Sequence, residues 1–103
     1  MNDNQIEQEI LSKGLTAPRV TPKDIEDNIA VVEYVKFVSA SGQTLRWAVI
    51  TTKSGYSVTG KSSCSVSAAN DNQEMGESIA LENARNELWP LMGYELKQRL
   101  SEK

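Results

Sequence analysis

One stretch of the sequence matches a phosphate-binding motif: Gly55-Tyr-Ser-Val-Thr-Gly60-Lys61-Ser62. This motif binds phosphate when a strand leads into the glycine-rich loop and a helix begins at the Lys-Ser pair, so that backbone N–H groups surround the anion. Here the interior of the motif, residues 56–59, has strand character, and Ser63-Cys64-Ser65 is a poor helix start. We therefore interpret the stretch as a strand that ends in a turn, and not as a nucleotide site.

Composition excludes several kinds of catalytic and metal site. The chain has no histidine and one cysteine, Cys64, which removes Ser-His-Asp and Cys-His nucleophiles, His/Cys zinc sites and any intrachain disulfide. We interpret Cys64 as a small, partly buried apolar residue. Four carboxylates lie on the predicted solvated side of a helix, so we expect no metal site or cofactor: Glu74, Glu77, Glu82 and Glu87. The sequence predicts a binding protein and not an enzyme.

A basic and partly aromatic surface is the main candidate for a binding site. The net charge is −3, but residues 32–61 carry +3 and residues 62–90 carry −4. Such a surface suits a nucleic-acid strand, a nucleotide or an acidic protein partner. Two other interpretations stay open, namely an ordinary solvated sheet face and a face covered by the N-terminal helix. The candidate residues are Tyr34, Lys36, Arg46 and Lys61.

Two short helices are expected before the sheet. Residues 3–13 have apolar residues at helical spacing and end before Gly14. Thr21-Pro22 is a strong helix start, because threonine caps well and proline suits the first helical position, and this helix should end near Ala30. We divide the chain into an N-terminal helix with its linker, residues 1–18, and a single α+β domain, residues 19–103.

The middle of the chain predicts a three-stranded antiparallel meander over residues 31–38, 45–52 and 56–60. Residues 61–70 are expected to form a loop. The outer strands of such a sheet could pair across a homodimer. Strand alternation defines two faces. One face carries Val35, Phe37, Leu45, Trp47, Val49, Tyr56 and Val58, and the other carries Tyr34, Lys36, Arg46, Ile50, Ser57, Thr59 and Lys61.

A long C-terminal helix should pack on the sheet. It begins near Asp71, and a stripe of small residues every four positions, Gly76, Ala80 and Ala84, lets it lie close to the strands. Pro90 should kink it after Trp89, and a second helix should run over residues 91–100. Trp47 and Trp89 are expected to anchor the core. The predicted fold is therefore α+β, a three-stranded antiparallel sheet packed by a kinked C-terminal helix.

The order of elements resembles the double-stranded-RNA-binding domain. That family contacts phosphates through a lysine cluster at the start of its last helix. The matching residues 70–77 carry Asp71, Glu74 and Glu77 and no cation. Only the topology is shared, and the resemblance does not extend to RNA binding.

A second resemblance covers about four-fifths of the chain, from residue 19 onward. It rests on Arg19-Val20-Thr21-Pro22, on residues 54–64, on Gly76, Ala80 and residues 82–85, and on Leu88-Trp89-Pro90-Leu91-Met92-Gly93-Tyr94. These segments resemble the phage gene 49/gene 66 family of small tailed-phage proteins. One departure is Ala69-Asn70-Asp71-Asn72, where the family usually has a Phe-Asp pair before the helix. The resemblance implies a phage or prophage accessory protein acting in the host, and it implies no catalytic residues.

Two functional hypotheses follow. The first is a non-enzymatic phage accessory protein that binds a host protein or a host defence component. The alternative is a binder of an anionic ligand, either nucleic acid or a nucleotide signal, on the basic face. The N-terminus has no secretion signal and no apolar run approaches the length of a membrane span, so we expect a cytoplasmic protein without membrane partners.

Overall fold

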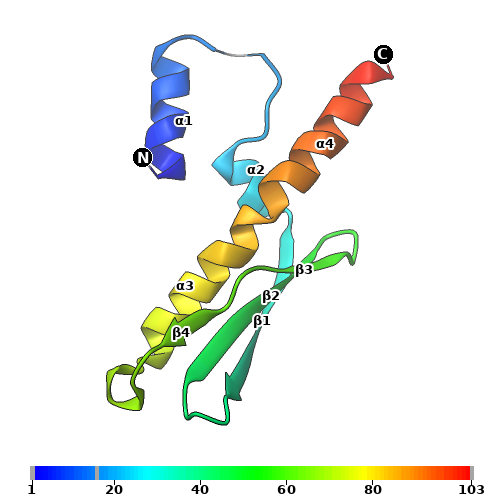
Figure 1. The fold of residues 1–103 in the computed structure, drawn as a ribbon. Helices are drawn as coiled ribbons and strands as arrows, with labels where there is room; N and C mark the ends of the chain where they lie inside the picture. Colours follow the sequence, from blue (N-terminus) through cyan, green and yellow to red (C-terminus); the bar gives the residue numbers. More distant parts are fainter. Residues whose placement is uncertain (1, 16, 103) are drawn as a thin grey trace.

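The computed structural model describes residues 2–15 and 17–102 (Figure 1). Helix α1 spans Asp3–Ser12 and is capped by the Asn2 side chain, and Gly14 follows it with a φ of 67°. Helix α2 spans Pro22–Asp27, and its N-cap Thr21 exchanges hydrogen bonds with Asp24. Both predicted helices are confirmed. The second ends earlier than expected, because Asn28 caps it and the first strand begins at the next residue.

The sheet is antiparallel in the order β1-β2-β3, with strands β1 (Ile29–Val38), β2 (Thr44–Thr52) and β3 (Ser57–Thr59). A further strand, β4 (Ser63–Ser65), pairs with the start of β2 at Thr44–Arg46, whereas β3 pairs with its end. The prediction of a loop over residues 61–70 was therefore wrong in part. Strands β3 and β4 act as one third strand that is interrupted at residues 60–62.

The chain ends in two helices, α3 (Gln73–Asn86) and α4 (Leu88–Ser101), which meet at a bend at Glu87. The bend lies three residues before Pro90, and not after Trp89 as the sequence suggested. A proline ring clashes with the carbonyl group four residues earlier, which here belongs to Asn86. Pro90 is consequently the third residue of α4, where the missing N–H has no acceptor within the helix.

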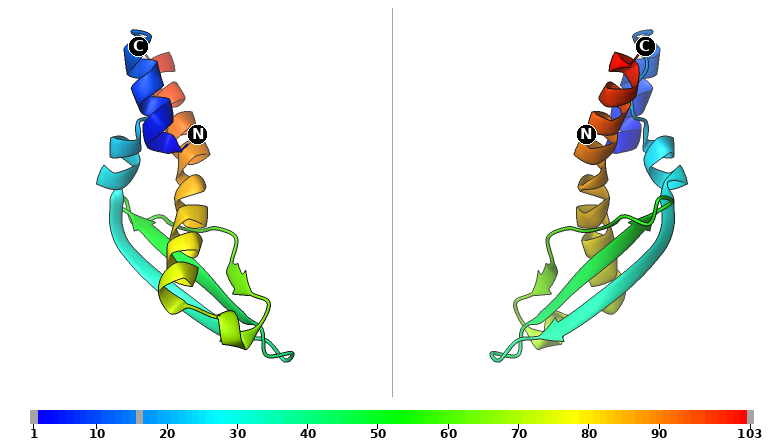
Figure 2. Two further views of the ribbon diagram at one scale, coloured as in Figure 1. Left: turned by 90° about the vertical axis from the view of Figure 1, so that its left-hand side faces the viewer. Right: turned by 90° about the vertical axis from the view of Figure 1, so that its right-hand side faces the viewer.

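Helix α3 covers one face of the sheet and leaves the other face without a second layer (Figures 1 and 2). Every second side chain of β2 is buried, so these side chains point toward the helix. They are Thr44, Arg46, Ala48, Ile50 and Thr52. The hydrophobic core lies between β2, α2 and the α3–α4 bend. It consists of Ile25, Ala48, Ile50, Ala80, Ala84 and Leu88.

Small residues explain how close the helix lies to the sheet. Ala80 and Ala84 on α3 are fully buried, which confirms the predicted small-residue stripe, and they pack in one cluster with Ala48 of β2. Gly60 follows β3 and lies against the α3 backbone at Asn83, whose side-chain amide donates to the Lys61 carbonyl oxygen at 2.9 Å. The helix therefore crosses the third strand where that strand has no side chain.

Candidate functional site

The face of the sheet away from α3, here called the outer face, is apolar and is covered by none of the described elements (Figure 2). At its centre β1 and β2 present Val35 opposite Trp47 and Phe37 opposite Leu45. Phe37 is 58% exposed, and Val31 and Val35 are exposed to a similar extent. By alternation and register the outer face comprises Val31, Glu33, Val35, Phe37, Leu45, Trp47, Val49, Thr51, Ser57, Thr59 and Cys64.

This arrangement corrects three expectations from the sequence. Trp47 is a half-buried member of the outer face and not a core anchor, whereas Trp89 does pack against the core. Cys64 is exposed and not partly buried. Val58 lies opposite Ile50 on the helix side of the sheet, whereas the sequence placed it on the face of Trp47. The residues of β3 therefore lie on the opposite faces from those predicted.

The structure separates the four residues of the predicted basic surface. Tyr34 and Lys36 are exposed on the helix side of β1. Arg46 is the register partner of Lys36, but it is only 5% exposed. Lys61 is exposed in the segment between β3 and β4. Three of the four residues therefore share one side of the sheet, and the central cation among them is buried.

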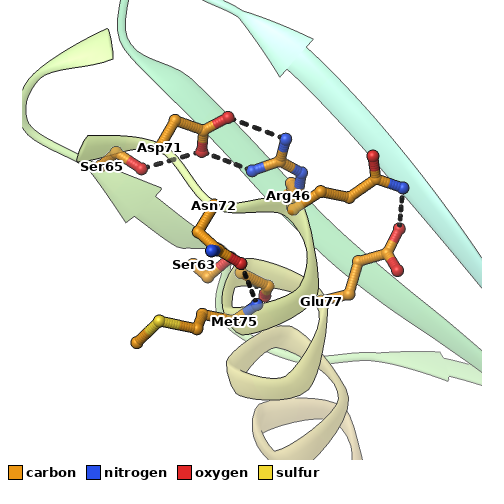
Figure 3. A network of polar contacts seen from close by, with 9 residues as sticks. Arg46, Ser63, Ser65, Asp71, Asn72, Met75 and Glu77 are labelled. Carbon is orange, nitrogen blue, oxygen red and sulfur yellow. Dashed lines mark hydrogen bonds and ion pairs between the residues drawn. The ribbon is translucent and has the colours of Figure 1, made fainter. Parts of the chain in front are cut away.

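Asp71 neutralises that buried cation (Figure 3). Arg46 Nη1 donates to Asp71 Oδ1 at 2.5 Å, and Arg46 Nη2 donates to Asp71 Oδ2 at 2.9 Å. Ser65 of β4 donates to the same carboxylate at 2.9 Å. These hydrogen bonds lower the pKa of Asp71 from its ordinary 3.8 to about 2, with the Arg46 bond as the largest cause. The hydrogen bond to Asp71 also raises the pKa of Arg46. The pair ties β2, β4 and the segment before α3 together.

The start of α3 is held by two further polar contacts near Arg46 (Figure 3). The Asn72 side chain caps the helix by accepting a hydrogen bond from the Met75 N–H at 2.9 Å. Ser63 of β4 donates to the Gly76 carbonyl oxygen at 2.7 Å. A Cβ atom at Gly76 would lie 3.1 Å from Arg46 Nη1, so the missing side chain makes room for the guanidinium. These contacts fix the start of the helix against β4 and Arg46.

The phosphate-binding motif does not have the geometry that its chemistry requires. Its last residues, Lys61 and Ser62, lead into strand β4 and not into a helix, so no helix N-terminus faces the loop. Among residues 2–15 and 17–102 there is also no group of three potential metal ligands.

The sequence did contain a signal for the orientation of the sheet. Ala48 lies at the centre of β2, on the same face as Arg46 and Ile50. It is the only small apolar residue of that strand. A helix with a stripe of glycine and alanine packs closely against a small side chain and less closely against a tryptophan. Matching Ala48 to Ala80 and Ala84 would have predicted that α3 covers the Arg46 side and leaves Trp47 on the open side.

The fold and its surfaces define a small α+β domain with one covered and one open sheet face. The chain belongs to the family described as Phage protein (N4 Gp49/phage Sf6 gene 66) family, whose model matches residues 20–100. This confirms the resemblance found in the sequence. No curated protein and no solved structure matches the chain. None of the described helices is both long enough and apolar enough to cross a membrane.

Proposed function

We propose that this phage-family protein is a non-enzymatic accessory protein that binds a protein of the host cell through its outer face. The observation that supports the proposal is the open apolar surface around Val35, Phe37 and Trp47. Large contiguous apolar patches on a small soluble domain mark interaction sites more often than solvated surface. Aromatic residues that are rigid and half-buried are also the usual anchors of protein–protein interfaces.

The chemistry of the outer face favours a protein partner over an anionic one. By alternation and register it carries one ionisable carboxylate, Glu33, and no lysine or arginine. A nucleic acid or a nucleotide needs cations to replace its counterions. A partner that presents an apolar strand or helix would instead bury the side chains of this face without desolvating a charge.

Substitution of Phe37 by glutamate tests the proposal. We expect affinity-tagged wild-type protein to capture a specific host protein from lysate, and we expect Phe37→Glu to capture it at least about tenfold less, because the interface would bury an unpaired carboxylate. Tyr94→Glu is the matched control, because Tyr94 is 71% exposed on α4, away from the sheet. Quantitative mass spectrometry of the three captures provides the measurement.

Equal capture by wild type and Phe37→Glu would refute the outer face as the binding site. Loss of the partner with Tyr94→Glu alone would place the site on α4. Circular dichroism of both variants checks that each is folded, and both substituted side chains are exposed, so we expect little loss of stability.

The anionic-ligand hypothesis has less structural support. Arg46 is bound to Asp71 on both nitrogens of its fork, which leaves Lys36 and Lys61 as the exposed cations of the predicted set. If an anion nevertheless binds there, oligonucleotide or nucleotide affinity should fall steeply with salt and should be lost in Lys36→Glu with Lys61→Glu. Binding that survives both changes would reject this hypothesis.

A further inference from the structure

Strand β1 forms an open edge of the sheet. It pairs with β2 on one side, and no described element lies beside it on the other side (Figure 2). Eight of its ten residues are exposed, although the strand is mostly β-branched or aromatic. Helix α3 packs mainly on β2. A long apolar edge of this kind readily pairs with another strand.

The hydrogen bonds of the hairpin show which backbone groups are available at this edge. The Ser39 N–H donates to the Gln43 carbonyl oxygen at 2.8 Å, next to the Val38–Thr44 register pair. Ser39 and Gln43 thus form a hydrogen-bonded pair, and in an antiparallel ladder such pairs alternate with non-hydrogen-bonded ones. Counting back along β1 from Ser39, the odd-numbered residues direct their N–H and C=O groups toward β2. The even-numbered residues direct theirs to the open edge. They are Val32, Tyr34, Lys36 and Val38.

Strand β1 lacks the features that usually protect an edge strand. Edge strands are normally protected by proline, by several lysines or by short length. This strand has ten residues, no proline and one lysine, and it shows exposed apolar side chains on both faces, with Val35 and Phe37 on one and Tyr34 and Val38 on the other. The strand therefore lacks the features that normally keep an edge from pairing with another strand.

We propose that two copies of this protein pair through β1 in antiparallel fashion, which forms a twofold-symmetric dimer with one continuous sheet. A twofold axis perpendicular to the sheet keeps the outer faces of both copies on the same side. Even-numbered residues of one copy then lie opposite even-numbered residues of the other, so the backbone groups left open by one copy are satisfied by the same groups of the second. The dimer also joins the two outer faces into one larger apolar surface.

The two charges of β1 select the register of this pairing. A register centred on Glu33 would place Glu33 opposite Glu33 of the second copy, and one centred on Lys36 would place Lys36 opposite Lys36 of the second copy. Like charges directly opposite each other are unfavourable. The two registers centred on the residues between Glu33 and Lys36 avoid both like-charge contacts. One places Tyr34 opposite Tyr34, and the other places Val35 opposite Val35. In both, Lys36 faces an uncharged residue of the second copy. The strand is therefore complementary to itself, which favours a second copy over an unrelated partner strand.

The experiment compares Tyr34→Lys with Tyr94→Lys. Tyr34 is 41% exposed and points away from the outer face, so its substitution leaves the proposed host-protein site intact. In either register the new lysine lies opposite a lysine of the second copy, a contact that natural edges use to prevent pairing. We expect sedimentation equilibrium to give twice the 11.4 kDa chain mass for wild type and Tyr94→Lys. We expect Tyr34→Lys to dissociate at least about tenfold more readily.

Several outcomes would overturn the dimer. Wild type that stays at the mass of one chain at all concentrations would do so, as would a Tyr34→Lys variant that is as dimeric as wild type. If wild type is a monomer and Tyr34→Lys loses a captured host protein, the edge accepts a partner's strand and not a second copy. The two proposals are tested separately by Phe37→Glu. If this variant loses the host protein but stays dimeric, the host protein binds the outer face and the dimer forms through a different surface, β1.

A cross-linking measurement stays informative if Tyr34→Lys is poorly folded. In a Cys64→Ser background, single cysteines are introduced at residue 34, at residue 35 or, as the control, at residue 94. Directly opposite residues of an antiparallel pair have Cα atoms about 4.5–5.5 Å apart, within the range of a disulfide. We expect rapid disulfide-linked dimers with Tyr34→Cys or Val35→Cys and none with Tyr94→Cys. Equal cross-linking at all three positions would reject pairing through β1.

Discussion

Replacing Gly60 with alanine is expected to destabilise the domain by about 3 kcal/mol, at the upper end of the cost of overpacking. A Cβ atom at this position would lie 2.6 Å from the Ala84 nitrogen and closer still to the Asn83 carbonyl group, both in the backbone of α3. Carbon atoms in contact normally lie about 3.5–4.0 Å apart. Since the obstacle is backbone and not a flexible side chain, helix and sheet must separate to admit a single methyl group.

Gly93→Ala is the matched control for this prediction. Gly93 lies within α4, and a Cβ atom there would meet nothing within 4 Å. The same substitution should therefore stabilise the protein by about 0.5–1 kcal/mol, because glycine weakens a helix interior. Urea unfolding followed by far-ultraviolet circular dichroism measures both. If Gly60→Ala proves as stable as Gly93→Ala, then α3 does not lie against the third strand as described.

The second large effect is expected at the buried ion pair. Asp71→Asn keeps the shape of the side chain but leaves the Arg46 guanidinium without a counter-charge in a site where it is 5% exposed. Removing one partner of a buried pair costs more than the pair contributes, because the remaining charge stays desolvated. We expect a marked fall in the urea midpoint at pH 7. Arg46→Met combined with Asp71→Asn should recover part of the loss, because it removes the unpaired charge.

The same pair makes a specific prediction about pH. The pKa of Asp71 is lowered to about 2 in the folded protein, against an ordinary value of 3.8. A lowered folded-state pKa contributes stability that is complete above the unfolded value and is lost as the pH falls through the folded value. The stability difference between wild type and Asp71→Asn should therefore be constant above about pH 5 and should shrink toward pH 2.

Asp27→Asn is the control for both measurements. Asp27 pairs with Lys23 at 2.6 Å on the exposed surface of α2, and exposed pairs contribute little to stability. This variant should have nearly the wild-type urea midpoint at pH 7. A loss as large as that of Asp71→Asn would show that removal of any carboxylate, and not the burial of Arg46, causes the effect.

Local signals predicted most of the elements, because each depends on a few neighbouring residues. The capping pair Thr21 and Asp24 starts α2, and Gly14 follows the end of α1 with a positive φ. The small-residue stripe Gly76, Ala80, Ala84 identified the side of α3 that faces the sheet. The bend before Pro90 was predicted within three residues, and the difference follows from which backbone carbonyl the proline ring displaces.

The candidate site was harder to predict, because alternation defines two faces of a sheet but not which one is covered. The basic surface depended on Arg46 being exposed, whereas Asp71 binds it from 25 positions along the chain. No local pattern links those two residues. The short strand β4 was missed for a similar reason, because three residues of Ser-Cys-Ser form a strand only when β2 supplies the partner.

The amino-acid sequence settled what the chain lacks and what its elements are. Without histidine, and with a single cysteine, it has no residues for the nucleophile, zinc or disulfide chemistry considered above, and its periodicities specify helices, strands and the close-packing side of α3. Tertiary packing decided which surface is left to bind a partner. Helix α3 needs small side chains beneath it, so it covers Ala48 and Gly60 and leaves Trp47 and Phe37 on the outer face. That choice depends on the fit between surfaces distant in the chain, which no local pattern encodes.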